Sequence, residues 1–176
     1  MNRLLVAVTC LAAFAVAPVA AQQQHPARPF TAAASAAGWG GARWGASPEE
    51  VQRAIPAARP VPPERQGRGC GEGDGRALLE ITQHRDFGRT WETTFCFSGV
   101  GASGLRAVHM WRADDTNFHA VAREMITRHG EPSHCTRGQL VPGERYEWAA
   151  GGTSITFVHM QTHSGGIAYK AAQPPR

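Results

Sequence analysis

The sequence predicts an α+β fold in which a duplicated αβββ unit forms one antiparallel sheet, with two helices packed on one face. Two observations lead to this prediction. A well-capped helix start at Ser47–Val51 precedes three strand-like stretches, and the same order of elements recurs after residue 113. We therefore expect a single α+β domain at 38–176, built from half-repeats at about 38–112 and 113–171.

The first 37 residues have the composition of an export signal followed by a flexible segment. Arg3 precedes an apolar run at Leu4–Val16, and Val19–Ala21 is a small-residue cleavage site, so we expect residues 1–21 to be a signal peptide. The apolar run is too short to anchor the chain in a bilayer. Residues 22–37 lack an apolar period, which predicts a flexible segment. We expect a periplasmic or secreted protein without a membrane anchor.

The charge of the chain does not indicate a nucleic-acid partner. Its 18 Lys and Arg residues and 14 acidic residues leave a formal net charge of +4, with His neutral. No cluster of basic residues forms the stripe that phosphate binding needs. We therefore expect no nucleic acid among the partners.

The first half of the chain predicts one helix and three strands. Ser47 is a suitable N-cap, Pro48 fits the first helical position, and Glu50 lies three residues after the cap, which together make a capping box. Pro56 ends the helix, and a loop rich in Pro and Gly continues to Gly75. Alternation of apolar and polar residues then predicts strands at 77–84, 90–97 and 105–111.

The second half repeats this order. Asp114–Asn117 reads as a helix start in which Thr116 is the cap that corresponds to Ser47. Apolar residues at helical spacing over 118–129 predict an amphipathic helix, which Gly130 ends. The expected strands lie at 144–149, 153–159 and 167–171.

Three cysteines remain after the signal peptide, and an oxidising compartment favours one disulfide and one free thiol. Cys96 alternates with the apolar residues of its strand, so it points away from the helices. Cys70 lies in the Gly-rich loop before the first hairpin, whereas Cys135 follows the second helix. We favour the pairing Cys70–Cys96 over the other two, and a bridge of that length stabilises the fold by about 3 kcal/mol.

Several short motifs resemble a known family. They are the capped Trp-Gly-x-Ser-x-Glu-Glu-Val helix from Trp44, the strand meander, and a helix that ends in His-Gly-Glu-Pro at Pro132. Together they resemble the unit shared by outer-membrane assembly lipoproteins of the SmpA/BamE type, and the tandem form is similar to the β-lactamase inhibitory protein family. The resemblance spans Gly38–Ala171 and implies a protein-binding module, either an envelope accessory or inhibitor-like. The chain departs from the lipoproteins because no cysteine stands at the cleavage site.

We expect the protein partner, in the cell envelope, to lie on the sheet face away from the helices. Strand alternation places Glu92, Thr94 and Met160 on that face, and Trp111 is a candidate for the same surface. Trp91 precedes Glu92 on the same strand and points to the opposite face, so it is expected in the core.

No pattern of residues indicates catalysis or a cofactor. Glu49–Glu50 and Asp114–Asp115 already serve helix starts, and Ser103 lacks the spacing of a nucleophile elbow. We therefore predict that the protein is not an enzyme. An enzyme would need a pocket that holds His109 or His134 beside a thiol or a carboxylate.

The alternative prediction is a periplasmic protein that binds copper or zinc through His and Met side chains. The candidates are His109–Met110 and the stretch from His159 and Met160 to His163. Neighbouring residues of a strand point to opposite faces, and His159 and His163 would lie about 13 Å apart on a continuous strand. No residue is therefore assigned as a metal ligand.

Overall fold

A computed structural model describes residues 38–98, 104–112, 117–138, 143–160 and 164–172. The predicted signal peptide and flexible segment, and the residues Ser103, Asp114–Thr116 and His163, lie outside this described part of the chain. The described elements, in chain order, are β1 (Gly38–Trp39), β2 (Ala42–Arg43), α2 (Pro48–Ala54), β3 (Arg59–Pro60), the short 3-10 helix η1 (Pro63–Arg65), β4 (Arg76–Asp86), β5 (Arg89–Ser98), β6 (Gly104–Arg112), α3 (Phe118–His129), β7 (His134–Arg137), β8 (Gly143–Ala150), β9 (Thr153–Met160) and β10 (Ser164–Ala171).

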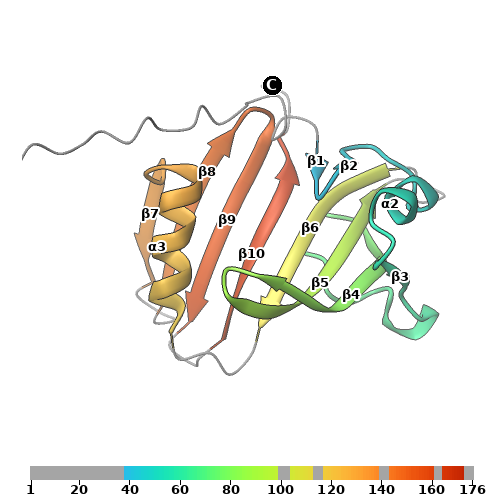
Figure 1. The fold of residues 1–176 in the computed structure, drawn as a ribbon, viewed down its shortest axis with the longest axis horizontal. Helices are drawn as coiled ribbons and strands as arrows, with labels where there is room; N and C mark the ends of the chain where they lie inside the picture. The colour runs from blue at the N-terminus through green and yellow to red at the C-terminus, as the bar shows by residue number, and fades with distance from the viewer. Residues whose placement is uncertain (1–37, 99–103, 113–116, 139–142, 161–163, 173–176) are drawn as a thin grey trace, which may run out of the picture. The chain divides into compact units, whose positions relative to one another are not determined.

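The fold is α+β, with one large antiparallel sheet and two α-helices in the described residues, as predicted. Eight strands form this sheet in the order β3-β4-β5-β6-β10-β9-β8-β7, while β1 and β2 pair separately. The last strands of the two halves, β6 and β10, therefore pair at the centre of the sheet (Figure 1).

The predicted αβββ unit is wrong in its strand count, because β3 and β7 add a fourth strand to each half of the sheet. These strands hold only two and four residues, and all of them are exposed. Neither strand therefore carries the apolar alternation by which a strand is recognised in a sequence.

Helix α2 begins as the sequence predicted. The Ser47 hydroxyl accepts a hydrogen bond from the Glu50 amide at 3.3 Å, and the Glu50 carboxylate accepts one from the Ser47 amide at 2.8 Å. Glu49 accepts a hydrogen bond from the Ser47 hydroxyl, so both carboxylates belong to the helix start. Val51 is the buried residue of this short helix.

Helix α3 begins at a different cap from the predicted one. Asn117 caps the helix, with its side chain accepting a hydrogen bond from the Ala120 amide at 3.3 Å. The prediction of Thr116 is therefore wrong by one residue, because Asn and Thr are both good caps and adjacent in the sequence. Gly130 follows the last turn, as expected.

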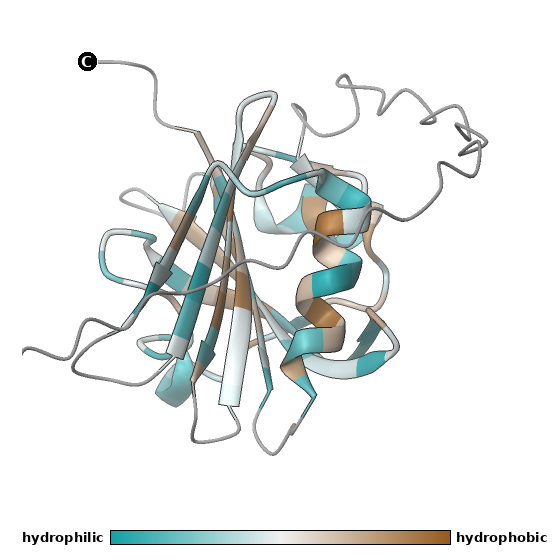
Figure 2. Cartoon of the chain, turned by 90° about the vertical axis from the view of Figure 1, so that its left-hand side faces the viewer, coloured by the Kyte–Doolittle hydropathy of each residue, from teal (hydrophilic) through white to brown (hydrophobic). Residues whose placement is uncertain are grey.

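The core lies on the face of the sheet that both helices cover. Val51 of α2 packs in a cluster with Phe95 and Val108, and α3 packs in a second cluster that contains Trp91 and Met110. Trp91 and Phe95 alternate along β5, as do Val108 and Met110 along β6, so the two clusters share one face. Figure 2 shows α3 lying along this face, with the sheet seen edge-on.

A hydrogen bond near the start of α2 helps to join the two halves on the helix side. Trp44, just before α2, donates its indole N–H to the hydroxyl of Thr153 on β9 at 3.0 Å. Within the described part of the chain, no helix is both long and apolar enough to span a bilayer.

Candidate functional site

The candidate site is the sheet face on the side away from α2 and α3, which we call the outer face. Pairing places Glu92 beside Trp111, and Trp111 beside Gly166 of β10. Thr94 lies next along β5, beside His109. Met160 lies on the same face of β9, because it alternates with the buried residue Phe157. The structure therefore brings Glu92, Thr94 and Trp111 together at adjacent positions, while Met160 lies two strands from Trp111.

Trp111 is the most conspicuous side chain of the outer face. It is 43% exposed, and it is the only large hydrophobic residue classed as exposed in the described part of the chain. Its indole lies over Gly166, since a Cβ atom built on that glycine would stand 2.8 Å from Cε3 of the ring. The glycine thus provides the space that the indole occupies.

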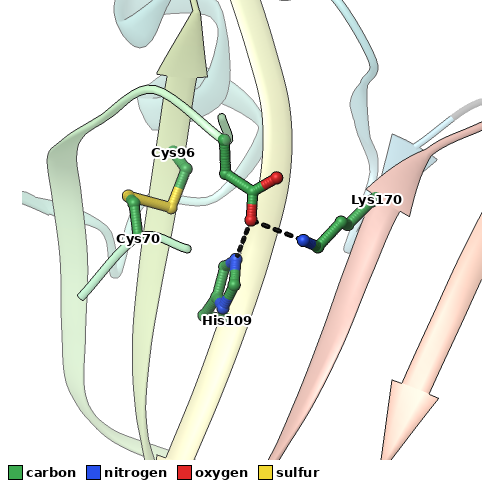
Figure 3. The surroundings of a disulfide bond; sticks show 5 residues. Cys70, Cys96, His109 and Lys170 are labelled. Carbon is green, nitrogen blue, oxygen red and sulfur yellow. Dashed lines mark hydrogen bonds and ion pairs between the residues drawn. A yellow bond between two sulfur atoms is a disulfide. The ribbon is translucent and has the colours of Figure 1, made fainter. Parts of the chain in front are cut away.

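A Gly-rich segment, residues 66–75, lies over the outer face of the first half. Cys70 in this segment forms a disulfide with Cys96 of β5, and their Cα atoms are 5.9 Å apart, so the predicted pairing is confirmed (Figure 3). Gly69 of the segment approaches Thr94, because a Cβ atom on Gly69 would lie 3.1 Å from the threonine hydroxyl. Cys135 is a free, exposed cysteine on β7.

An ionic cluster fixes the end of this segment. The buried Asp74 carboxylate accepts a hydrogen bond from His109 Nε2 at 2.9 Å and forms an ion pair with Lys170 Nζ at 2.6 Å (Figure 3). His109 belongs to β6 and Lys170 to β10, so one carboxylate joins the segment to both halves of the sheet. A carboxylate that is only 7% exposed needs such partners to offset its loss of hydration.

Burial lowers the pKa of His109 below its ordinary value of 6.5, and the hydrogen bond to Asp74 offsets part of this effect. Burial, together with the charge of Arg128, also lowers the pKa of His129, at the end of α3. Both rings are therefore neutral in the folded protein at neutral pH.

We expect the free energy of unfolding to fall as the pH drops below about 6.5, because the unfolded chain then binds protons that the folded chain does not. The variant His109→Gln keeps a side-chain N–H donor for Asp74 but cannot titrate, so it should flatten this dependence. Urea unfolding at several pH values between 7.5 and 5 measures the effect. A dependence as steep in His109→Gln as in the unchanged protein would contradict it.

Two surface hollows lie on the outer face. The first, of about 300 Å³, lies between the segment near Gly69 and strands β4 and β5, and Glu92 and Thr94 contribute to its lining. The second, of about 370 Å³, is lined by charged groups at the ends of β6 and β10. These charged side chains are Glu72, Asp74, Arg106 and Lys170.

The residues considered for catalysis or metal binding do not come together in one site. His109 stands beside a carboxylate, but its ring is hydrogen-bonded to Asp74 and lines neither hollow. His134 and Cys135 are exposed on β7, away from His109 at the centre of the sheet. In the described residues, no group of three His, Cys, Asp or Glu side chains could hold a metal ion. The copper or zinc alternative stays a prediction.

Asp74 and Lys170 were missed by sequence reasoning. Asp74 stands between two glycines in a loop, and Lys170 is the chain's only lysine, near its end. Their positions in the sequence do not indicate that the two side chains are in contact, because this contact depends on the pairing of β6 with β10.

No family model matches the chain, and no curated protein matches it. The solved structures include the crystal structure of a DUF4309 family protein (YjgB) from Bacillus subtilis, to which the chain is similar at 12% sequence identity. That match has a TM-score of 0.40 and covers 72% of this chain and 78% of the other.

Proposed function

We propose that this chain is an exported protein-binding module that binds its partner through the outer face of the sheet. The observation that carries the proposal is the exposed indole of Trp111, seated on Gly166, where the two central strands of the sheet pair. Tryptophan is enriched among the residues that dominate binding energy, because it supplies a large rigid area at small entropic cost. An exposed indole supported from below by the sheet has this character.

Neighbouring side chains supply the polar contacts that surround such an anchor. Glu92 lies beside Trp111, and Thr94 and His109 form the next row across β5 and β6. On the far side, Val158 lies beside Gly166 and extends the apolar surface towards β9. An aromatic centre with a polar rim is the usual arrangement of a protein interface.

Export is the second part of the proposal. The Cys70–Cys96 disulfide supports it, because disulfides persist in oxidising compartments and are rare in the cytosol. The apolar start of the sequence supports it as well. We place the protein in the periplasm or outside the cell.

We also propose that the two halves arose by duplication of one unit, a helix followed by four strands. The mirrored strand order, with β6 beside β10 and with β3 and β7 at the edges, supports this origin. The tandem resemblance noted in the sequence fits the same account.

The experiment uses photo-crosslinking from defined positions. A benzophenone amino acid is placed at Thr156 on the outer face and, in a separate variant, at Arg123 on the exposed side of α3. Each protein is incubated with cell-envelope extract of the source organism. Thr156 should crosslink to a defined partner that Arg123 does not reach.

The affinity of the purified partner is then measured with the unchanged protein and with Trp111→Ala. We expect the variant to bind at least about tenfold more weakly. Gly166→Val is the matched test, since it leaves Trp111 in the sequence but displaces its ring, and it should weaken binding similarly. Equal affinity for all three proteins, or a crosslink only from Arg123, would refute the proposed surface.

A further inference from the structure

The two edges of the eight-stranded sheet differ in how they are protected. At one edge, β3 consists of Arg59 and Pro60, and a proline has no N–H with which to bind another strand. The other edge is formed by β7 (Figure 1), which contains no proline and whose four residues are all exposed. An unprotected edge strand is a template for pairing with another chain.

The hydrogen bonds of β7 show which backbone groups face outwards. Gly138 donates to the carbonyl of Gly143 at 2.9 Å, which continues the register in which Arg137 faces Glu144. In an antiparallel ladder, hydrogen-bonded pairs alternate with pairs that are not hydrogen-bonded. Counting back from Gly138 in steps of two, the backbone groups of Thr136 and His134 therefore bond inwards to β8. The N–H and C=O groups of Cys135 and Arg137 therefore point away from β8, towards the edge of the sheet.

We propose that β7 pairs in antiparallel fashion with β7 of a second copy of this chain, around a two-fold axis at Cys135. The outward groups of Cys135 in the two copies then form a reciprocal pair of hydrogen bonds. Such a contact is self-complementary, as a two-fold dimer requires, and it closes the unprotected edge. The two eight-stranded sheets join into one continuous sheet.

Charges select this register. With Cys135 facing Cys135, His134 of one copy lies opposite Thr136 of the other, and Arg137 lies opposite Ser133. No like charges then face each other directly. A pairing centred on Arg137 would place two guanidinium groups opposite each other, which is destabilising.

The proposal is independent of the proposed function. The dimer uses the edge of the sheet and leaves Trp111, which lies on β6 four strands from β7, uncovered on each copy. Failure of the dimer would thus leave the protein-binding proposal untouched, and changes at Trp111 should leave the dimer unchanged.

The test measures self-association by analytical ultracentrifugation of the exported chain between about 1 μM and 1 mM. Cys135→Ser is the reference protein, because it keeps the backbone N–H and removes the thiol, so the Cys70–Cys96 disulfide is studied without a reductant. Cys135→Pro removes the outward N–H of this residue. We expect Cys135→Ser to form dimers as the concentration rises, and Cys135→Pro to associate at least about tenfold more weakly.

A second variant keeps the test decisive if Cys135→Pro does not fold. Cys135→Lys places two ammonium groups opposite each other and should weaken association similarly. A Cys135→Ser protein that stays monomeric throughout, or dimers that persist equally in the folded Pro and Lys variants, would overturn the proposal.

Crosslinking of the unchanged protein tests the register. The Cα atoms of a hydrogen-bonded antiparallel pair lie about 5.5 Å apart, within the range of disulfides. Oxidised glutathione should therefore join the two Cys135 thiols, which lose two protons and two electrons while one glutathione disulfide becomes two glutathione thiols. Arg123→Cys in the Cys135→Ser background is the control. Equal dimer yield from both proteins would overturn the register.

Discussion

Replacing Phe118 by alanine should lower the free energy of unfolding by about 3–5 kcal/mol, the usual cost of truncating a fully buried phenylalanine. Phe118 is the first residue of α3 and has no exposed surface. Its ring lies 6.2 Å from the Phe157 ring and 6.5 Å from the Trp91 ring, so it joins the helix to strands of both halves. Alanine would leave a cavity where these elements meet.

The sheet cannot close that cavity easily. A Cβ atom on Gly165 would lie 2.8 Å from Cε1 of Phe118, so the ring occupies the space above a residue without a side chain. Urea unfolding measures the loss, and Arg123→Ala on the exposed side of α3 should change stability by less than about 0.5 kcal/mol. A loss below about 1 kcal/mol for Phe118→Ala would mean that α3 does not depend on this contact.

Removing the disulfide in a double Cys70→Ser, Cys96→Ser variant should lower the free energy of unfolding by about 3 kcal/mol. The disulfide closes a loop of the unfolded chain, and the variant leaves that loop open. The sequence separation of the two residues is 26. In the folded variant, the Gly-rich segment is still held at its two ends, by the hydrogen bonds of Gln66 and by the contacts of Asp74 with His109 and Lys170. We therefore expect faster amide hydrogen exchange over 66–75 as well as lower stability.

The matched control for this experiment is Cys135→Ser, which removes a thiol without opening a covalent loop. It should leave the free energy of unfolding and the exchange of the Gly-rich segment unchanged. If the double variant loses less than about 1 kcal/mol, the denatured chain must already hold the two regions close together.

Local patterns predicted much of the fold. Alternation along β5 assigned Trp91 to the core and Cys96 to the opposite face, and both are buried where expected. The capping box at Ser47 is likewise a local feature, since its two hydrogen bonds join residues three apart. Such signals are reliable because the residues that make them are close in the sequence.

Other features could not be found this way. The short edge strands β3 and β7 exist because a neighbouring strand offers its hydrogen-bonding groups, and their own residues show no strand pattern. The position of Leu105 shows the same limit. Strict alternation along β6 would place Leu105 on the same face as Trp111, but an irregularity between Cys96 and Phe97 shifts the register, and Leu105 packs in the core.

The sequence alone determined the α+β class, the start of α2, the alternation of the main strands and the favoured cysteine pairing. The tertiary structure alone decided that β6 pairs with β10. That pairing seats Trp111 over Gly166 and brings Lys170 to Asp74. The physical reason is that each of these contacts joins residues more than 50 positions apart, and only strand pairing fixes which of them meet.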